Sequence, residues 1–582
     1  MQESSAQQAT IQARLPFVAI FLILMAAYLV INLANFQFFP RSVRQELEKI
    51  GSSITNTTLR VPAERGLIFD RDGEPLAFNI VQYRLGVSPA LVADADSLSS
   101  QVAEILDIDE FEVYRKTISE NIWEFVAGPI SAEKGQALAA LDEISLGLEE
   151  IPKRFYPQGT LAAHVIGIVL NEGLVGSLGV EGAYNDTLAG RVLDLSVSNV
   201  PFDLPEDRPA EQRGQDIVLT IDRDIQFWVE SELKAAVDEY RAFRGTAIVM
   251  NPRNGDVLAL ANYPTMDPNN FLDVEDPSLL ENAAVQETYE PGSIIQALTV
   301  ASALERGAIT PYWTYNDTGQ LSVGGRDIWN RHFQSHGSTD AATILIRSLN
   351  AGAATISLQM GTEDFYSMMR AFGLGQATGV GLFAEDPGEV RIEGETNWNE
   401  SYLGFNSFGQ DMKATSMQLI TAFAAIANDG VMRQPRIVRQ VISEDGVEEA
   451  RPTTVRRVLS AETAASVRDM LIRVVREGAP GAYMRGYTIA GKPGTAWIST
   501  AVGQEYGPHS SIVTFAGFFP AYDPEVVIFV KLDRPNEYYG YNVTPHVFRR
   551  IADRIVILLE IPNDEVRSRL EAAETDIVVA GS

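Results

Sequence analysis

The chain contains no cysteine, which excludes both disulfide bridges and thiolate chemistry. Histidine is scarce too, with five copies in 582 residues. The five are His164, His332, His336, His509 and His546. None has the spacing of metal ligands, such as two histidines on one helix turn with a glutamate. We interpret them as structural or surface groups, and we expect neither a metal nor a cofactor.

Basic residues are few compared with acidic ones. Lysine and arginine total 46 against 77 aspartates and glutamates, which gives a net charge of −31. A nucleic acid needs a basic surface for its phosphates, so nucleic-acid binding is excluded as a function. A chain of 582 residues is too long for a single core. Two or three domains are therefore expected.

One long stretch near the N-terminus has no charged residue at all, from Leu15 to Pro40. A membrane-spanning helix needs about 20 apolar residues, so this stretch is long enough. It lacks a small-residue cleavage pattern, which favours an uncleaved anchor over a signal peptide. Arg14 precedes the span, whereas three basic residues follow it, namely Arg41, Arg44 and Lys49. The residues alone leave the orientation open, because this distribution leans weakly against an exported body.

After the anchor, residues 41–58 suggest a helix and a polar linker, and strand and helix patterns then alternate to about residue 205. The segment 201–212, rich in proline and charge, predicts a boundary. The following part begins with a strand at 217–222, a helix at 224–240 and a hairpin turn at 251–256. Strand patterns return at 487–491, 511–519 and 526–531. Strands at both ends with helices between them predict a sheet whose strands are far apart in sequence.

A loop at 289–292 leads into a mostly apolar stretch, and Ser293 stands where that helix should begin. An apolar run of this kind is typical of a helix buried nearly all round. The positive end of its dipole suits a nucleophile whose product is an oxyanion. The same position suits an ordinary helix cap. This stretch alone leaves both interpretations open.

Five short signatures follow one another in a familiar order. They are residues 65–73, 155–184, 219–222, 407–410 and 491–496. In their order and spacing the chain resembles a class B penicillin-binding protein, from the anchor to about residue 560. The resemblance implies a membrane-anchored protein with a pedestal and a serine transpeptidase domain that cross-links peptidoglycan outside the cell. It also implies a cytoplasmic N-terminus.

The resemblance implies an α/β (α+β) fold, with an antiparallel sheet flanked by helices in the transpeptidase domain. We expect a cytoplasmic tail at 1–14, a transmembrane helix at 15–40, a pedestal at 41–212, a transpeptidase domain at 213–560 and a flexible acidic tail at 561–582. The expected location is the plasma membrane, crossed once. Expected partners are stem peptides, β-lactams, the membrane and a polytopic glycosyltransferase.

The family's chemistry rests on the motifs Ser-x-x-Lys, Ser-x-Asn and Lys-Thr-Gly. The resemblance makes Ser293 the nucleophile and Ser348 and Asn350 the second motif, which relays a proton to the leaving group. The lysine of the first motif, which deprotonates the serine, is replaced by Gln296. A glutamine amide does not titrate in a useful range, so it cannot take the serine proton. Losing such a group typically costs about 10⁴–10⁶ in rate.

The third motif also departs from the family pattern, because Pro493 follows Lys492 where the family has a hydroxyl residue. Proline removes a strand N–H and the hydroxyl that the family offers to the substrate carboxylate. An edge strand tolerates proline, so we expect the fold to survive and substrate recognition to weaken. Gly494 and Thr495 remain, and the family implies an oxyanion hole from the N–H groups of Ser293 and Thr495.

Three functions stay open. The first is an impaired homologue that holds partners of the elongation or division machinery. The second is an active D,D-transpeptidase that uses Lys492 or another base; whether Lys413 reaches the cleft is open. The third is a β-lactam or muropeptide sensor, which would normally add a signalling domain across the membrane, and the short tail before Leu15 leaves no room for one. A second Ser-x-x-Lys, from Ser131 to Lys134, is interpreted as a helix cap.

Overall fold

The computed structural model describes residues 23–29, 56–61, 63–170, 175–190, 193–198, 213–395, 398–498 and 508–570. Its contacts divide the chain into two compact units, one of residues 1–63 with 191–212 and one of residues 64–190 with 213–582. In the first unit, β1 (Asn56–Val61) pairs antiparallel with β8 (Leu193–Ser198). The strand β1 begins within the stretch expected to be a linker.

Several expectations lie outside the described residues. They are the tail at 1–14, residues 41–55, the boundary at 201–212 and residues 571–582. Of the expected anchor, only residues 23–29 are described, and they are helical. A search of the described residues finds no helix of the length and apolarity that a membrane crossing requires.

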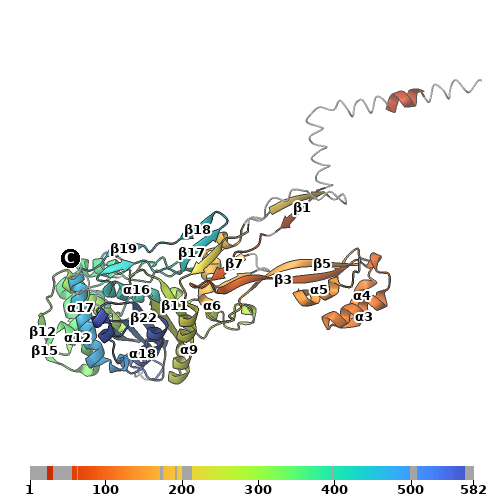
Figure 1. Ribbon diagram of the computed structural model, residues 1–582. Coiled ribbons are helices and arrows are strands. Elements are labelled where there is room, and N and C mark those ends of the chain that lie inside the picture. The colour runs from red at the N-terminus through yellow and green to blue at the C-terminus, as the bar shows by residue number, and fades with distance from the viewer. Residues whose placement is uncertain are drawn as a thin grey trace, which may run out of the picture. The chain divides into compact units, whose positions relative to one another are not determined.

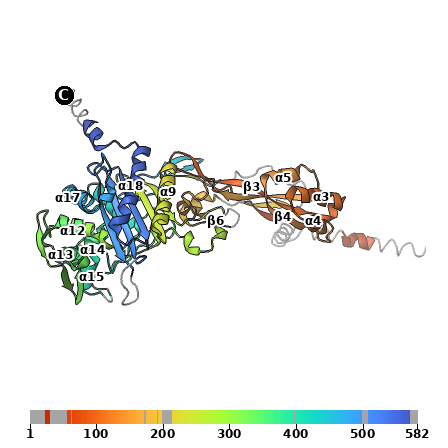
Figure 2. The same cartoon turned by 90° about the horizontal axis from the view of Figure 1, so that it is seen from below.

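The pedestal region (residues 64–190) is built on long antiparallel strands. β3 (Pro75–Val87) pairs with β2 (Ile68–Phe69), β4 (Glu124–Ser131) and β5 (Leu146–Phe155). Three helices pack against this sheet, namely α3 (Ala95–Leu106), α4 (Glu110–Thr117) and α5 (Ala132–Ala139), as both views show (Figures 1 and 2). Short elements complete the region: α6 (Ala163–Ile166), β6 (Ile168–Leu170), β7 (Val175–Ser177), α7 (Gly179–Ala183) and α8 (Asn185–Leu188).

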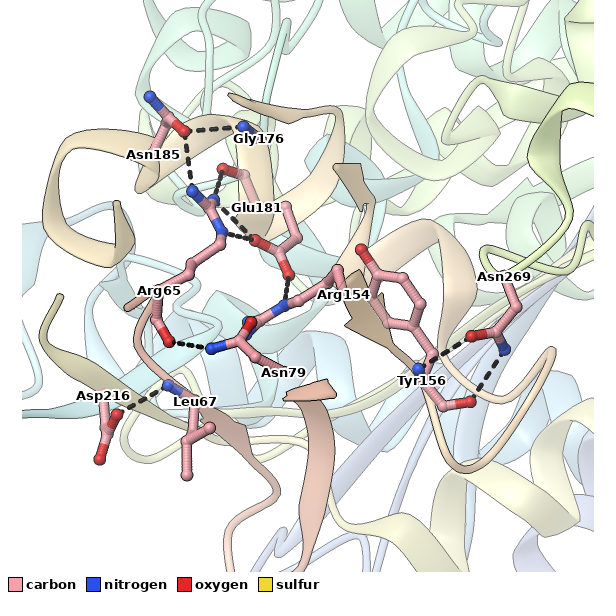
Figure 3. A network of polar contacts seen from close by, with 10 residues as sticks. All are labelled: Arg65, Leu67, Asn79, Arg154, Tyr156, Gly176, Glu181, Asn185, Asp216 and Asn269. Atoms are coloured by element: carbon pink, nitrogen blue, oxygen red, sulfur yellow. Dashed lines mark hydrogen bonds and ion pairs between the residues drawn. The ribbon is translucent and has the colours of Figure 1, made fainter. Parts of the chain in front are cut away.

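A buried ionic network holds the pedestal region together (Figure 3). Glu181 is fully buried, and its two carboxylate oxygens each lie 2.7 Å from an arginine nitrogen, one from Arg65 and one from Arg154. Asn185 accepts a hydrogen bond from Arg65, and Asn79 accepts one from Arg154. We call this set the pedestal network. Buried charges are tolerated only when they are paired and hydrogen-bonded. The pedestal network therefore links Arg65, at the start of the region, to Glu181 near its end.

One sheet passes from the pedestal region into the C-terminal region (residues 213–570). Strand β2 runs parallel to β9 (Asp216–Leu219), and β9 pairs antiparallel with β17 (Val438–Ser443). The order is β18-β17-β9-β2-β3-β4, with β18 (Gly446–Glu449) at one edge and β5 also paired to β3. Outside the sheet, the Tyr156 N–H donates to the Asn269 side chain at 3.0 Å (Figure 3). Backbone hydrogen bonds therefore join the two regions.

The core of the C-terminal region is a five-stranded antiparallel sheet, as predicted. Its order is β11 (Val257–Tyr263), β10 (Arg244–Met250), β22 (Val526–Asp533), β21 (Ser511–Phe519) and β20 (Ala490–Trp497). Successive residues of β10 point to opposite faces, so Ala247 and Val249 pack with α9 (Arg223–Tyr240) and α18 (Gly540–Leu558), whereas Ile248 packs on the other side. The two faces thus hold two hydrophobic cores.

The core on the face of Ile248 is covered by helices that lie, in sequence, between the first and last strands of the sheet. They are α10 (Ala283–Gln286), α11 (Ile295–Glu305), α12 (Ala341–Arg347), α13 (Asn350–Met360), α14 (Thr362–Ala371), α15 (Ser401–Asn406), α16 (Ser416–Ala427) and α17 (Ala461–Arg473). Two-stranded sheets lie among them: β12 (Thr314–Asp317) with β15 (Gly337–Asp340), β13 (Gln320–Val323) with β14 (Arg326–Trp329), and β16 (Val431–Arg433) with β19 (Thr454–Arg457).

The predicted elements at 224–240, 511–519 and 526–531 correspond to α9, β21 and β22, and β10 and β11 form the predicted hairpin. Ser131 caps α5 as expected, since its hydroxyl accepts from the Lys134 N–H at 3.4 Å. The strand expected at 487–491 begins only at Ala490, because the N–H of Thr488 donates to Asp564 instead of to the sheet.

The acidic tail expected to be flexible from Ile561 makes specific contacts at its start. Ile561 is buried, and its carbonyl accepts from the Tyr487 hydroxyl at 2.8 Å. Residues 564–570 are helical, and Arg567 forms ion pairs with Asp523 and Glu525. The first part of the expected tail therefore belongs to the C-terminal region.

Candidate active site

Ser293 lies in a 3-10 turn, Gly292–Ile294, that leads directly into α11. The helix is buried from Ile295 to Ala303, as the apolar run predicts. Gly292 has φ +67°, and a Cβ atom there would lie 2.5 Å from the carbonyl oxygen of Thr495 on β20. Only glycine fits that approach. The turn is also held by its Gly292 N–H, which donates to the Gly409 carbonyl at 3.0 Å.

A cleft of about 960 Å³ opens over this turn. Six of the residues singled out in the sequence line it, from three separate segments of the chain. They are Ser293, Ser348, Asn350, Lys492, Pro493 and Thr495. Gln296 lies behind the cleft surface with no exposed area. Gly494 is also buried. The fold thus brings the positions of the three motifs together.

The Gln296 amide is held at both ends by the second motif. Its Oε1 accepts from the Ser348 hydroxyl at 3.1 Å, and its Nε2 donates to Oδ1 of Asn350 at 3.1 Å. Ser348 ends α12 in a left-handed conformation, with φ +56° and ψ +53°, and Asn350 begins α13. An amide offers both an acceptor and a donor, which a lysine ammonium does not. Gln296 therefore binds the second motif as a neutral bridge.

Lys492 reaches the same bridge from β20. Its side chain is fully buried, and Nζ donates to the Ser348 hydroxyl oxygen at 3.3 Å and to the Pro493 carbonyl at 3.1 Å. Among the described residues no carboxylate forms an ion pair with it. Burial therefore lowers the pKa of Lys492 to about 7. Near neutral pH a substantial fraction of this amine is uncharged.

The other lysines considered as bases lie elsewhere. Lys413 does not line the cleft; its side chain is 55% exposed, and its Nζ is 3.9 Å from Glu389. Lys531 is buried and pairs with Glu287 at 2.9 Å and Asp533 at 3.2 Å. Within the described part of the chain, no side chain forms a hydrogen bond with the Ser293 hydroxyl. The serine thus lacks a directly bonded base.

Strand β20 forms one edge of the five-stranded sheet, so Pro493 lies on an edge strand as expected. Pro493 is paired with Phe515 of β21. A Cβ atom on Gly494 would lie 2.3 Å from the Thr514 hydroxyl oxygen and 3.3 Å from Cβ of Ile294. Glycine at 494 therefore lets the strand approach the start of α11. The Thr495 hydroxyl accepts from the Gly540 N–H at 3.0 Å, which links β20 to α18.

Sequence reasoning missed an aromatic group on the cleft wall. The rings of Tyr539 and Tyr541 are stacked, with centroids 5.6 Å apart, and Trp497 lies 5.8 Å from Tyr539. The guanidinium of Arg331 is 5.0 Å from the Tyr539 ring and 4.8 Å from the Tyr541 ring. A signal was available in the tyrosines at 538, 539 and 541, but nothing in the sequence pairs them with Arg331.

The antiparallel sheet, the buried helix behind Ser293 and the shared cleft agree with the fold that the resemblance implies. The family model of the penicillin-binding protein transpeptidase domain matches residues 245–553, and that of the penicillin-binding protein dimerisation domain matches residues 60–193. The chain belongs to the class B penicillin-binding proteins, the family of peptidoglycan D,D-transpeptidases.

Individual relatives agree with this assignment. Stage V sporulation protein D of Bacillus subtilis is 30% identical over 544 residues, covering 90% of this chain and 82% of that protein. The probable peptidoglycan D,D-transpeptidase PenA of Neisseria gonorrhoeae is 29% identical over 566 residues, covering 94% and 93%. The structure of penicillin-binding protein 3 of Mycobacterium tuberculosis in complex with ampicillin is similar with a TM-score of 0.67 and 30% identity, covering 87% of this chain and 97% of that one.

Proposed function

We propose that this protein binds D-Ala-D-Ala stem peptides and β-lactams at Ser293 and is impaired in transpeptidation. The observation that supports this most is the Gln296 amide, which occupies the position of the family's base and is bonded to Ser348 and Asn350. Relatives named as D,D-transpeptidases and a relative solved with ampicillin support the ligand class. The cleft lined by Ser293 has the volume for such ligands.

The reaction itself explains why the base matters. In acylation, Oγ of Ser293 would form an ester bond to the penultimate D-alanine carbonyl, and the C–N bond to the terminal D-alanine would break. The hydroxyl proton must leave Oγ and finally reach the departing amine. Gln296 accepts no proton near neutral pH. Binding and polarisation of the carbonyl remain possible, because they need only N–H donors, so acylation should be slow rather than absent.

A second candidate function is an active transpeptidase with Lys492 as its base. The specific observation in its favour is burial, which lowers the pKa of Lys492 to about 7, together with the 3.3 Å contact from Nζ to the Ser348 hydroxyl. A neutral amine there could receive the Ser293 proton through Ser348 or a water molecule. This route adds a transfer that a directly bonded base does not need, so we rank it second.

We further propose that the protein is anchored in the plasma membrane by residues 15–40, with its N-terminus in the cytoplasm. The uncharged stretch from Leu15 to Pro40 supports this location. An impaired enzyme that keeps the fold and the cleft would act by holding partners of wall synthesis. A polytopic glycosyltransferase is the partner that we propose.

Intact-mass measurement after exposure to benzylpenicillin tests the proposal. We expect the wild-type chain to gain the mass of the ligand slowly, over hours, and the Ser293→Ala variant not at all. Gln296→Lys should accelerate labelling by about 10³-fold or more, because it restores a group that can take the proton. Gln296→Met, of similar size but without a base, should not. Rapid labelling of the wild-type chain would contradict the proposal of an impaired enzyme. It would favour an active transpeptidase with Lys492 as its base.

A further inference from the structure

Arg331 lines the cleft of an acidic chain as a cation. It follows β14 and begins the 3-10 turn Arg331–Phe333, and its side chain is exposed. Its guanidinium lies over the rings of Tyr539 and Tyr541. Among the described residues, the Arg331 guanidinium forms neither an ion pair nor a hydrogen bond. Five N–H donors are therefore available in a position that two aromatic rings define.

The backbone that carries Arg331 is firmly placed. The side chain of the preceding Asn330 is buried, donates to both carboxylate oxygens of Asp317 at 2.9 and 3.0 Å and accepts from the Ala351 N–H at 3.0 Å. The following His332 and Phe333 have φ values of +57° and +55°. Left-handed conformations cost energy in non-glycine residues and persist only where the surroundings impose them. This turn thus presents Arg331 to the cleft beside α13, which begins at Asn350.

The contacts of Tyr539 place Arg331 near β20. The residue after Tyr539 is Gly540, whose N–H donates to the Thr495 hydroxyl at 3.0 Å. Trp497, at the end of the same strand, contacts the Tyr539 ring at 5.8 Å. The guanidinium therefore stands beside the C-terminal half of the strand that carries Pro493. At Pro493 both the backbone N–H and a side-chain hydroxyl are missing.

We propose that Arg331 binds the C-terminal carboxylate of the stem peptide, and the ring carboxylate of a β-lactam, in place of the donors missing at Pro493. This inference rests on the proposed function of the cleft. A guanidinium can donate two parallel hydrogen bonds to a carboxylate, and stacking on two tyrosines orients its fork before the ligand arrives. The interaction is non-covalent, so it concerns binding and specificity and leaves the acylation step as described above.

The other charged groups of the cleft wall do not remove this charge. Asp327 accepts a hydrogen bond from the Ser322 hydroxyl, and Glu477 is bonded to Arg473, which lies outside the cleft lining, at 2.9 Å. Arg347 also lines the cleft, and its Nη1 is 3.4 Å from Nδ1 of His336. Within the described ranges no aromatic ring lies over the guanidinium of Arg347, which immediately precedes Ser348. It offers a control of equal charge in the same cleft.

The test compares two peptides on the full chain carrying Ser293→Ala, so that no acyl bond forms. The probes are diacetyl-L-lysyl-D-alanyl-D-alanine and its C-terminal amide, titrated calorimetrically. We expect the acid to bind about 10-fold to 100-fold more tightly than the amide. Adding Arg331→Gln should abolish this preference, Arg331→Lys should keep part of it, and Arg347→Gln should leave it unchanged.

A second arm restores the missing hydroxyl. In the Pro493→Thr background, the effect of Arg331→Gln on the acid-to-amide ratio should shrink to a few-fold, because the strand again offers donors. A preference that survives Arg331→Gln, or that Arg347→Gln reduces equally, would overturn the assignment. Equal binding of both peptides to the parent chain would overturn it as well and leave the proposed function intact. If neither peptide binds, the proposed function fails together with this inference.

Discussion

The pedestal network and the buried hydrogen bonds around Lys492 differ in how their charges are paired. In the pedestal network, Glu181 pairs with Arg65 and Arg154, and each contact is 2.7 Å long. In the cleft, Lys492 is buried beside Ser348 and the Gln296 amide, and no described carboxylate pairs with it. The first network keeps its ions because they are matched. The second contains a single ion, and burial lowers its pKa to about 7.

This difference in charge pairing shows how a neutral residue at position 296 affects the buried charge of the cleft. A lysine there would put a second amine behind the cleft near Lys492, and burial penalises each charge that lacks a partner. Gln296 instead satisfies the donors and acceptors of Ser348 and Asn350 without any charge. The side chains of the second motif are therefore hydrogen-bonded, although position 296 holds no group that titrates near neutral pH. Under the proposed function, Gln296 would preserve the packing of the site while it slows acylation.

The largest expected effect breaks the pedestal network. Glu181→Gln removes the carboxylate from between two buried arginines, so it should lower the free energy of unfolding by about 3–5 kcal/mol. Urea unfolding of the purified full chain would measure the change. Glu149→Gln is the matched control, because Glu149 is 68% exposed and lies 3.9 Å from Arg84. It should cost less than about 1 kcal/mol. Equal effects of the two variants would refute the role assigned to burial.

The next prediction applies one substitution to two buried lysines. Lys492→Met should raise the free energy of unfolding by about 1–3 kcal/mol, because it removes an unpaired buried amine. The gain should be full below pH 7 and should shrink toward pH 10, since the cost of lowering the Lys492 pKa disappears once the unfolded chain is deprotonated too. Lys531→Met should destabilise instead, because it removes the nearer cation of the buried Asp533, at 3.2 Å, and leaves only Arg244 at 4.0 Å. Unfolding curves at pH 6 and pH 10 would give the sign of the change in the free energy of unfolding for each variant.

A third experiment asks whether the Lys492 amine still acts as a base. If it does, residual acylation of Ser293 by benzylpenicillin should rise about tenfold per pH unit below 7 and then level off, following the neutral fraction of an amine whose pKa is about 7. The observable is the initial labelling rate between pH 5.5 and 9. A rate that falls above pH 7 would mean that the Lys492 cation, rather than its neutral form, assists the reaction.

The smallest expected effect concerns His164, which is buried in α6 and bonded through Nε2 to the Leu279 carbonyl at 2.8 Å. Burial lowers its pKa, so the folded chain binds this proton less readily than the unfolded chain. Stability should therefore fall as pH drops through about 6.5, the ordinary histidine pKa. His164→Gln keeps an N–H donor but does not titrate, and it should flatten the decline by up to about 1 kcal/mol. An unchanged pH profile would exclude His164 as its source.

Much of the C-terminal fold could be predicted from the sequence, because its strands and helices have clear apolar patterns. The strand over 511–519 and the helix over 224–240 are found within a residue of their predicted bounds. The late start of β20 could not be predicted, since Thr488 bonds to Asp564 only in the folded chain. The contacts of residues 561–570 could not be predicted for the same reason, because neither charge nor position in the chain indicates them.

The candidate site was predictable in its membership and less so in its connections. Motif order indicated Ser293, Ser348 and Lys492, and the cleft contains all three. Two facts needed the structure. Lys413 lies beside Glu389 and does not line the cleft, and Lys492 is buried against Ser348. The position of Arg331 depends on a contact across more than two hundred residues of chain, which local patterns do not encode.

The sheet that joins the pedestal and C-terminal regions bears on modularity. Strand β9 has β2 on one side and β17 on the other, so both of its backbone edges are covered. A chain that started at Arg213 would uncover one edge of Ile217 and Val218, which are buried here. An apolar strand with a free edge pairs readily with another chain. The C-terminal region therefore depends on the pedestal region to cover β9. A recombination event that exchanged one region without the other would leave this strand edge exposed.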